Sequence, residues 1–410
     1  MASLAEARAL DAADPLAAFR ERFALPPGVI YLDGNSLGAL PVATPARVAT
    51  VIEEEWGRDL IGSWNAAGWI GAARRVGARI APLIGAAADE VVVADSTSVN
   101  LFKLIAAAMT ARPGRTTILS EPGNFPTDLY VAQGVASLVP GARVRLVPVD
   151  QIAAAVDGDV AVVVLTHVHY KSGRMLDMAA LTRAAQAKGA LVLWDLSHSV
   201  GAVPVALNAC NADLAVGCGY KYLNGGPGAP AFLFVATRHH ATLRSPLSGW
   251  MGHAAPFAFD DDYRPAPGID RFQCGTPSIL GLAALEEGVA LFETMRFADV
   301  VAKSRALSTR WIDLVEARCA GHGFVLASPR DPAARGSHVS FAHPDAYPIC
   351  QALIARAVVG DFRAPDILRM GFTPLYTSHE DVWRAADILA DVMTTRAWDR
   401  DEYRTRAAVT

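Results

Sequence analysis

A lysine bracketed by glycines lies at the centre of the segment Gly217-Cys-Gly-Tyr-Lys-Tyr-Leu-Asn-Gly-Gly-Pro-Gly228. The segment follows a short apolar run, and a lysine in a glycine-rich turn after a strand can reach into a cleft with little steric obstruction. Lys221 is therefore either a catalytic amine or an ordinary surface lysine of a loop. The segment is not a phosphate-binding P-loop, because no Gly-Lys-Ser/Thr follows at the required spacing.

A carboxylate precedes this lysine at the end of the apolar run Leu191-Val-Leu-Trp-Asp-Leu-Ser-His198. Asp195 would lie at the carboxyl end of a buried strand, which is where ligands bind in open α/β sheets. A buried carboxylate needs a partner. Asp195 is either a helix cap or structural ion pair, or it keeps a pyridine nitrogen protonated so that the ring accepts electrons. One helix and one strand fit between Asp195 and Lys221, so both side chains can emerge at neighbouring strand ends.

The regions around these two residues alternate short β-branched runs with helical patterns, which predicts an α/β fold with a mainly parallel sheet. The predicted strands are Val91–Val93, Thr116–Leu119, Val144–Val147, Ala161–Leu165, Leu191–Trp194, Leu214–Val216 and Ala231–Val235, and helices are predicted at Asn100–Met109 and Ala179–Lys188. After about Leu280, helices at Gly281–Thr294, Ala298–Cys319 and Glu380–Thr394, with strands at Ser337–Phe341 and Ile367–Met370, predict a smaller α+β lobe. We therefore expect a large domain over residues 51–280 and a small domain over 281–410, with residues 1–50 on the small lobe or a dimer interface.

Two further segments place polar or aromatic residues next to predicted strands. Asp95-Ser-Thr-Ser-Val-Asn100 directly follows one strand, and its hydroxyls suit either a phosphate at a helix N-terminus or ordinary helix caps. In Asn124-Phe-Pro-Thr-Asp128, Phe125 either stacks on a flat ring or fills the core. No early strand ends in a dinucleotide-binding GxGxxG.

The composition narrows the class of protein. Of the 410 residues, 52% are apolar and 19% are charged, which is typical of a globular protein with a large interior. The net charge of −4 predicts no general affinity for nucleic acid or anionic membranes. No apolar run is long enough to span a bilayer, and the acidic N-terminus lacks the features of a signal peptide. The five scattered cysteines fit reduced thiols, so we expect a cytoplasmic protein.

Two histidine pairs are assigned no chemistry. His167 and His169 lack an evident carboxylate or cysteine companion, so structural roles are favoured over a metal site. The pair His239-His240 is interpreted as a solvated loop. No metal is therefore expected.

Taken together, several motifs resemble kynureninase, within the aspartate-aminotransferase-like fold of pyridoxal-phosphate enzymes. The matching blocks are Tyr31-Leu-Asp-Gly-Asn-Ser-Leu-Gly38, Ser96-Thr-Ser-Val-Asn100, Asn124-Phe-Pro-Thr-Asp128, Trp194-Asp-Leu-Ser-His-Ser-Val-Gly201, Gly219-Tyr-Lys-Tyr-Leu-Asn-Gly-Gly226, Gly249-Trp-Met-Gly-His253, Phe272-Gln-Cys-Gly-Thr-Pro277 and Arg369 with Pro374-Leu-Tyr376. The Asp-x-x-His and Tyr-Lys pattern is shared with cysteine desulfurases. The GNSLG, FPTD and GWMGH blocks in this order are far more specific.

The resemblance implies a role for each matching residue. Lys221 would carry pyridoxal 5'-phosphate as a Schiff base, Asp195 would pair with the pyridinium nitrogen, and Phe125 would stack on the ring. The other implied cofactor contacts are Thr97, Ser98 and Tyr220 at the phosphate, Thr166, Asp128 and His198 around the pocket, and Trp250 and Thr276 in the neighbouring subunit's site. The last two make a homodimer necessary. Arg369 would hold the substrate carboxylate as a bidentate fork.

The implied reaction is hydrolysis of L-kynurenine to anthranilate and L-alanine, in which water adds to the γ-carbonyl and the Cβ–Cγ bond breaks. Tyr220 would be a proton carrier in the later steps. The alternatives are a cysteine desulfurase or aminotransferase on the same fold, and a non-catalytic cofactor-binding regulator. A choice between kynurenine and 3-hydroxykynurenine stays open, with Trp64 and Ser36 as candidate ring contacts. A role in tryptophan breakdown or in NAD biosynthesis also stays open.

Overall fold

Seven short strands form one sheet in the computed structural model, which describes residues 3–406. The strands are β2 (Val91–Val93), β3 (Thr117–Ser120), β4 (Arg143–Leu146), β5 (Val160–Thr166), β6 (Leu191–Asp195), β7 (Leu214–Gly217) and β8 (Phe232–Val235). Their order is β2-β8-β7-β6-β5-β3-β4; β3 to β7 run parallel, and β8 is antiparallel to both of its neighbours. The predicted mainly parallel sheet is confirmed, with no strand end displaced by more than one residue.

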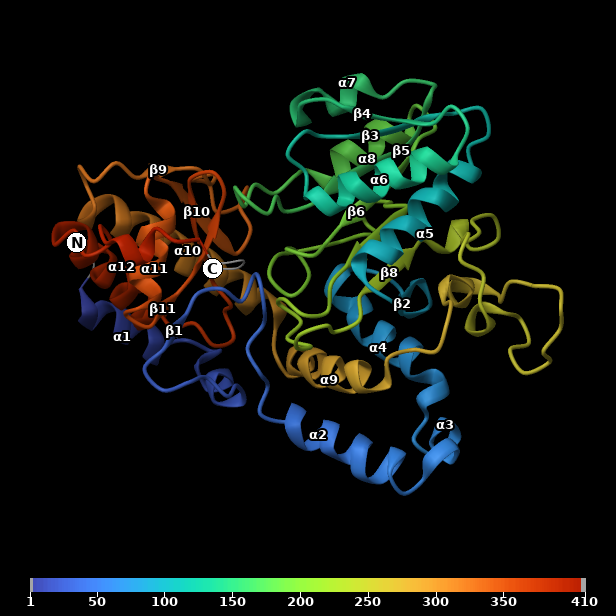
Figure 1. Ribbon diagram of the computed structural model, residues 1–410, viewed down its shortest axis with the longest axis horizontal. Coiled ribbons are helices and arrows are strands. Elements are labelled where there is room, and N and C mark those ends of the chain that lie inside the picture. The colour runs from blue at the N-terminus through green and yellow to red at the C-terminus, as the bar shows by residue number, and fades with distance from the viewer. Residues whose placement is uncertain (1–2, 407–410) are drawn as a thin grey trace.

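Eight helices complete the large lobe, and some of them cover the sheet (Figure 1). They are α2 (Thr44–Thr50), α3 (Ser63–Ala66), α4 (Ala72–Ile80), α5 (Thr97–Thr110), α6 (Pro126–Leu138), α7 (Ile152–Ala155), α8 (Met178–Gln186) and α9 (Ile279–Ala290). Helix α5 contacts β5 to β8, α6 contacts β3 and β4, and α8 contacts β6. Strands β5, β6 and β7 are buried at every residue, which explains why they read as continuous apolar runs in the sequence.

The small lobe has its own antiparallel sheet, in the order β12-β13-β10-β9. Its strands are β9 (Val325–Leu326), β10 (His338–Ala342), β12 (Asp361–Arg363) and β13 (Ile367–Gly371), and its helices are α10 (Phe297–Arg318), α11 (Ala346–Ile354) and α12 (His379–Thr394). The two predicted strands, β10 and β13, and the predicted helices α10 and α12 are confirmed. Helix α11 and strands β9 and β12 were not predicted; the two strands are only two and three residues long and do not stand out as apolar runs.

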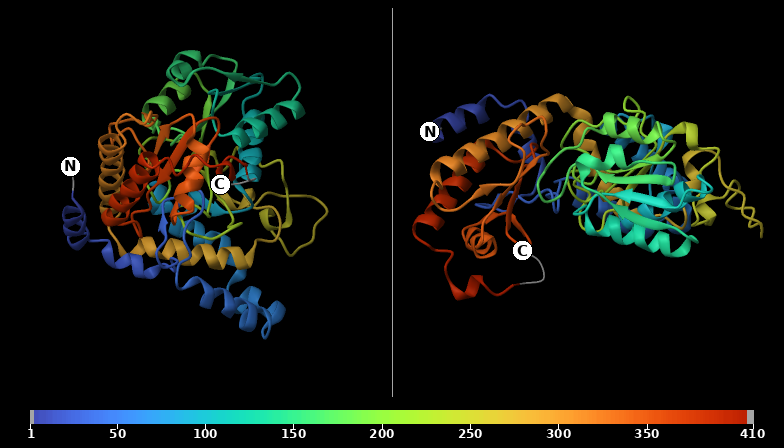
Figure 2. Two further views of the ribbon diagram at one scale, coloured as in Figure 1. Left: turned by 60° about the vertical axis from the view of Figure 1, so that its left-hand side comes forward. Right: turned by 90° about the horizontal axis from the view of Figure 1, so that it is seen from above.

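The N-terminal part of the chain runs from the small lobe to the large one (Figures 1 and 2). Helix α1 (Leu4–Ala12) packs on α12, and β1 (Ile30–Tyr31) pairs in parallel with β11 (Val358–Val359). We call residues 31–38 the crossing segment. The Gly38 N–H donates to Tyr220 O at 2.8 Å, next to Lys221. A side chain at Gly38 would overlap Lys221 O, and one at Gly34 would overlap the Thr373 and Tyr376 side chains, so close approach requires glycine at both positions.

The two lobes are built around two different apolar cores. The first contains the seven-stranded sheet together with Leu282, Leu285 and Val289 of α9, and α9 packs against α2 and α4. The second contains Leu307 and later residues of α10, together with α11 and α12. Helix α9 thus packs with the large lobe although most of it follows the proposed division at residue 280, and the domain limits stay a prediction.

Candidate active site

The functional side chains follow the carboxyl ends of strands that run in one direction. Thr166 ends β5, Asp195 ends β6 and Lys221 follows β7. Strand β2 is antiparallel to β8, which is antiparallel to β7, so β2 and β7 point the same way and Thr97 begins α5 at the same edge. This edge is where open α/β sheets bind ligands.

Lys221 is buried inside the site and is not a surface lysine, since only 8% of the residue is exposed. Its Nζ lies 3.0 Å from His198 Nε2 and 5.7 Å from the centroid of the Phe125 ring. Burial, reinforced by the charge of Lys221, lowers the pKa of His198 well below its usual value. His198 is therefore neutral at pH 7, and its Nε2 can accept a hydrogen bond from the Lys221 ammonium.

Two carboxyl groups lie near this lysine. Asp195 is 3% exposed and accepts from Ser197 N at 2.8 Å, while Asp128 is buried beside Thr166, whose Oγ1 lies 3.3 Å from Asp128 Oδ2. Burial raises the pKa of both carboxyls, the charge of Asp195 raises that of Asp128 further, and Lys221 lowers both. Asp128 and Asp195 thus lie near a single basic group, Lys221. A ligand with a protonated ring nitrogen would supply a second positive charge next to these two carboxyls.

Phe125 presents an aromatic ring to the same space. It precedes α6 and is about one-third exposed, so it does not fill the core. Its ring meets Tyr170 edge-on, with centroids 5.3 Å apart and planes at 85°. A flat ligand near Lys221 could therefore stack on it.

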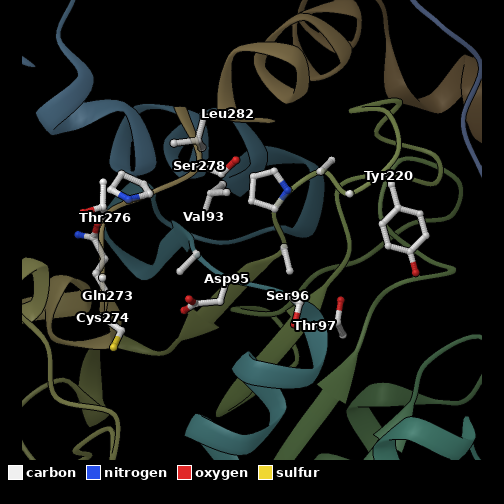
Figure 3. Close-up of a pocket in the computed structure, with 17 residues that line it drawn as sticks. Val93, Asp95, Ser96, Thr97, Tyr220, Gln273, Cys274, Thr276, Ser278 and Leu282 are labelled. Atoms are coloured by element: carbon white, nitrogen blue, oxygen red, sulfur yellow. The ribbon is translucent and has the colours of Figure 1, made fainter. Parts of the chain in front are cut away.

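A cavity of 490 Å³ opens beside these residues (Figure 3). Tyr220 and Thr97 line one side, and Thr276 lies on the other (Figure 3). Ser96 Oγ accepts from Val99 N at 3.3 Å and so acts as the helix cap, but Thr97 Oγ1 is buried without a partner among residues 3–406. An unpartnered hydroxyl at a helix N-terminus fits an anion such as phosphate. Ser98 lies in the first turn of α5 but does not line the cavity.

The segments expected to serve a neighbouring subunit lie at one side of this region. Thr276 is exposed and lines the cavity within the same chain. Trp250 does not line it; its ring packs edge-on against Trp64 at 6.0 Å and Phe257 at 5.7 Å. Neither position tests the contacts expected across a dimer.

Arg369 reaches the site from β13 of the small lobe and is 1% exposed. Its Nε donates to Asp361 Oδ1 at 2.8 Å, and its Nη1 donates to Tyr170 O at 2.5 Å. Ser36 Oγ accepts from Nη2 at 3.0 Å, so Ser36 lies beside the arginine. Because Tyr170 also contacts Phe125, Arg369 points towards the same region as Lys221.

Sequence reasoning missed two residues here. Asp361 lies on the unpredicted strand β12, opposite Arg369. His338 on β10 lies 5.3 Å from His198 between ring centroids, and neither of its buried ring nitrogens has a partner among residues 3–406. For His338, the only signal in the sequence was its polar side chain inside the predicted strand Ser337–Phe341.

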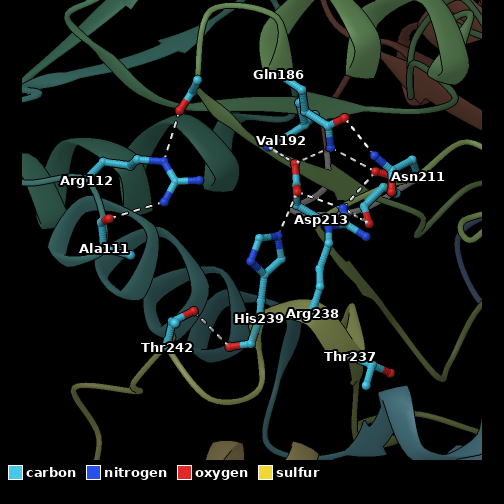
Figure 4. Close-up of polar contacts among 12 residues, drawn as sticks. Ala111, Arg112, Gln186, Val192, Asn211, Asp213, Thr237, Arg238, His239 and Thr242 are labelled. Atoms are coloured by element: carbon cyan, nitrogen blue, oxygen red, sulfur yellow. Dashed lines mark hydrogen bonds and ion pairs between the residues drawn. The ribbon is translucent and has the colours of Figure 1, made fainter.

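The interpretation of His239-His240 as a solvated loop is wrong. His239 Nε2 lies 2.8 Å from the buried Asp213 carboxylate, which also accepts from Arg238 (Figure 4). His240 is buried. Hence these histidines stabilise the large lobe, away from Lys221. His167 Nδ1 lies 2.9 Å from Ser199 Oγ, and His169 Nε2 lies 2.8 Å from Gly123 O.

Comparisons with known proteins agree with this arrangement. Residues 300–389 match the family described as Kynureninase C-terminal domain. The chain is 54% identical over 412 aligned residues to a kynureninase of Burkholderia mallei, covering 99% of each chain, and 52% identical over 408 to that of Pseudomonas fluorescens, covering 98% of each.

Solved structures show the fold. A cysteine desulfurase of Thermococcus onnurineus superposes with a TM-score of 0.79 at 19% identity, covering 92% of this chain and 98% of that one. A cysteine desulfurase of Escherichia coli gives 0.74 at 21% identity, covering 93% and 98%. The expected aspartate-aminotransferase-like fold, with a large mainly parallel lobe and a smaller α+β lobe, is confirmed.

Proposed function

Since the chain belongs to the kynureninase family, we propose that it hydrolyses L-kynurenine to anthranilate and L-alanine with bound pyridoxal 5'-phosphate. The observation that carries the proposal is 52–54% identity to relatives named kynureninase over nearly the whole length of both chains. The geometry supports it, because a buried lysine, a buried carboxylate and an arginine converge between two lobes.

The residues present fit this cofactor. Thr97 Oγ1 and His198 Nδ1 are buried polar atoms without partners among residues 3–406, and the two acids near Lys221 leave room for a further cation. Lys221 would hold the cofactor, and Asp195 would bind its ring nitrogen. The remaining proposed contacts are Phe125, Thr97, Ser98, Tyr220, Thr166, Asp128 and His198. When bound, pyridoxal phosphate supplies an electron sink for the bonds at the substrate's α- and β-carbons.

The chain's own side chains would orient the substrate and move protons. Lys221 Nζ, once released from the cofactor, would remove the α-proton, and neutral His198 at 3.0 Å could hold a hydrogen bond to that amine. Arg369 would fix the α-carboxylate. Burial raises the pKa of Tyr220, so its hydroxyl stays protonated at neutral pH and can donate a proton in later steps.

Turnover of L-kynurenine and 3-hydroxykynurenine by the purified protein tests the proposal directly. We expect anthranilate to appear, detected by its fluorescence, with L-alanine in equal amount. The comparison of kcat/KM for both substrates would also define the ring preference. A protein that binds the cofactor but releases no anthranilate from L-kynurenine would contradict the proposed function.

Thr97→Val should weaken cofactor binding while the fold is kept, because valine has the shape of threonine without the hydroxyl. Loss of one hydrogen bond to a charged phosphate should raise the Kd of pyridoxal phosphate by roughly 10- to 100-fold. Equilibrium titration of the apoprotein measures this. Thr110→Val, at the exposed far end of the same helix, is the matched control. Equal Kd values for the two variants would remove Thr97 from the phosphate site.

A homodimer with composite sites is the second part of the proposal. Large apolar side chains are exposed on the single chain, among them Ile61 at 79% and Phe259 at 80%. Exposed apolar surface of this kind is typical of a protein interface. Trp250 and Thr276 would complete the neighbouring subunit's cofactor site.

Mixing two inactive variants, Lys221→Ala and Trp250→Ala, should restore activity through hybrid dimers. Each hybrid would contain one intact site, so random reassociation should return about a quarter of wild-type activity. Lys221→Ala mixed with Asp195→Ala is the control, because both residues lie in one chain's site and no hybrid site would be intact. Full activity of Trp250→Ala alone, or an active monomer in sedimentation, would contradict composite sites.

We also propose a cytoplasmic location for the protein. Between residues 3 and 406, no helix has both the length and the apolar character needed to cross a bilayer. All five cysteines are unpaired, which supports a cytoplasmic location.

The alternative activity, a cysteine desulfurase, needs a reactive thiol on a mobile loop. Burial raises the pKa of Cys319 to about 11 and also raises that of Cys350, so these two thiols are poor candidates.

A further inference from the structure

The guanidinium of Arg369 is held from one side by a carboxylate on the neighbouring strand. Asp361 of β12 and Arg369 of β13 are paired directly across the antiparallel ladder. Nε donates to Asp361 Oδ1 at 2.8 Å, and Nη2 donates to Asp361 Oδ2. Both side chains are only 1% exposed. Two parallel charge-assisted bonds fix the plane of the guanidinium as well as its position.

The same carboxylate gathers further donors. Ser36 Oγ donates to Asp361 Oδ2 at 2.9 Å, and Arg363 Nη2 lies 2.7 Å from the same oxygen. On the other side of the guanidinium, Arg369 Nη1 donates to Tyr170 O, in the loop that contacts Phe125. Asp361 therefore occupies the Nε/Nη2 edge, whereas Nη1 points towards the lysine site.

The charges around Asp361 do not cancel. Arg363 and Arg369 carry two positive charges, and Asp361 supplies one negative charge. Asp33 is also close, but burial and the charge of Asp361 raise its pKa to about 7, so near neutral pH it carries only part of a charge. The cluster therefore keeps a net positive charge near neutral pH, which favours the binding of a ligand carboxylate beside the two arginines.

We propose that Asp361 is the positioning residue of the substrate-carboxylate site. Its carboxylate fixes the Nε/Nη2 edge of Arg369, so the α-carboxylate of an amino acid would approach the Nη1/Nη2 edge and take the place of Tyr170 O and Ser36 Oγ, which accept from Nη1 and Nη2 in the free chain. The inference rests on the proposed function, since it takes Arg369 as the group that binds the substrate carboxylate. Asp361 itself does not touch the substrate; it acts by fixing the direction of the arginine.

Asp361→Asn in the cofactor-loaded protein tests the proposal. Asparagine keeps the shape, but its amide N–H groups would face the N–H groups of the guanidinium. One of the two hydrogen bonds to Arg369 is therefore lost, and the guanidinium rotates. We expect KM for L-kynurenine to rise by roughly 10- to 100-fold, with a smaller change in kcat and an unchanged spectrum of the bound cofactor. Asp213→Asn is the matched control, because Asp213 is an equally buried carboxylate that is paired with an arginine (Figure 4). Asp213 directly precedes β7 and accepts from Val192 N near the start of β6, at the opposite end of that strand from Asp195.

A pair of ligands separates positioning from general destabilisation. L-Alanine has a carboxylate and L-alaninamide does not, and both can be titrated against the visible spectrum of the bound cofactor. Asp361→Asn should weaken L-alanine binding and leave L-alaninamide binding unchanged. A wild-type ratio of the two affinities, or tighter L-alanine binding caused by the lost negative charge, would overturn the proposal. These titrations do not require turnover of kynurenine, so their outcome is independent of the main test of function.

Two further variants keep the test decisive. If Asp361 acts through Arg369, adding Asp361→Asn to Arg369→Lys should change the L-alanine affinity less than about twofold, because interacting residues are not additive. Full additivity would overturn the proposal. If Asp361→Asn does not fold, Ser36→Ala removes a neutral link in the same cluster and should lower L-alanine affinity by roughly two- to tenfold. An unchanged ratio in Ser36→Ala would then count against it.

Discussion

Lys221→Ala is expected to lose both the covalent link to the cofactor and nearly all turnover. Removal of a general base alone should lower kcat by roughly 10²–10⁴-fold, and the missing link should add to that loss. The amine is buried next to a neutral imidazole and two carboxyls, and no other lysine lies in that position among residues 3–406. After borohydride reduction, mass spectrometry should find cofactor attached to the wild-type chain and none on the variant.

The control for this experiment is Lys188→Ala. Lys188 is exposed beyond the end of α8 and lies away from the ends of the strands that form the site. It should retain both the attached cofactor and full activity. If Lys221→Ala still turned over L-kynurenine at the wild-type rate, the assignment of the catalytic lysine would be wrong.

Arg369→Lys is expected to keep the bound cofactor and to lose catalytic efficiency. An amino-acid substrate must be held so that its α-proton bond stands perpendicular to the cofactor ring, and a planar guanidinium holds two oxygens where an ammonium offers a point charge. The loss of one charge-assisted bond should cost about 1.5–3 kcal/mol, or roughly ten- to more than a hundredfold in kcat/KM. The measurement is kcat/KM for L-kynurenine together with the cofactor spectrum.

The two outcomes of this experiment have different meanings. An unchanged kcat/KM would remove Arg369 from the substrate site. A lost cofactor spectrum would indicate that the arginine mainly has a structural role, by holding the small lobe to the large one through its bond to Tyr170 O. Arg356→Lys, at an exposed ion pair with Asp391 in the same lobe, is the control and should behave as wild type.

The sheet and the lysine site could be predicted because their signals are local. Each buried strand is a continuous apolar run, and Asp195 and Lys221 directly follow such runs. The helix cap at Ser96 and the unpartnered hydroxyl of Thr97 could not be distinguished in the sequence, since either residue type serves either purpose.

The carboxylate cluster could not be predicted because its members meet only in the folded chain. Asp361 is on a three-residue strand, and Ser36 belongs to a loop far away in the sequence. His338 reaches His198 from the other lobe. His239 was misinterpreted for the same reason, because its partner Asp213 comes from a different part of the large lobe.

Two separate hydrophobic cores allow the lobes to diverge independently in evolution. The proposed cofactor groups lie on the large lobe, and the proposed carboxylate clamp lies on β12 and β13 of the small lobe. Substitutions on β12 and β13 can therefore alter which amino acid is accepted while the groups proposed to hold the cofactor stay unchanged. The crossing segment is one segment that contacts both lobes: Gly34 packs against the small lobe and Gly38 against the lysine loop, so mutations there would be selected on both lobes at once. One ancestral scaffold could in this way acquire new substrates through its second lobe while retaining its cofactor chemistry.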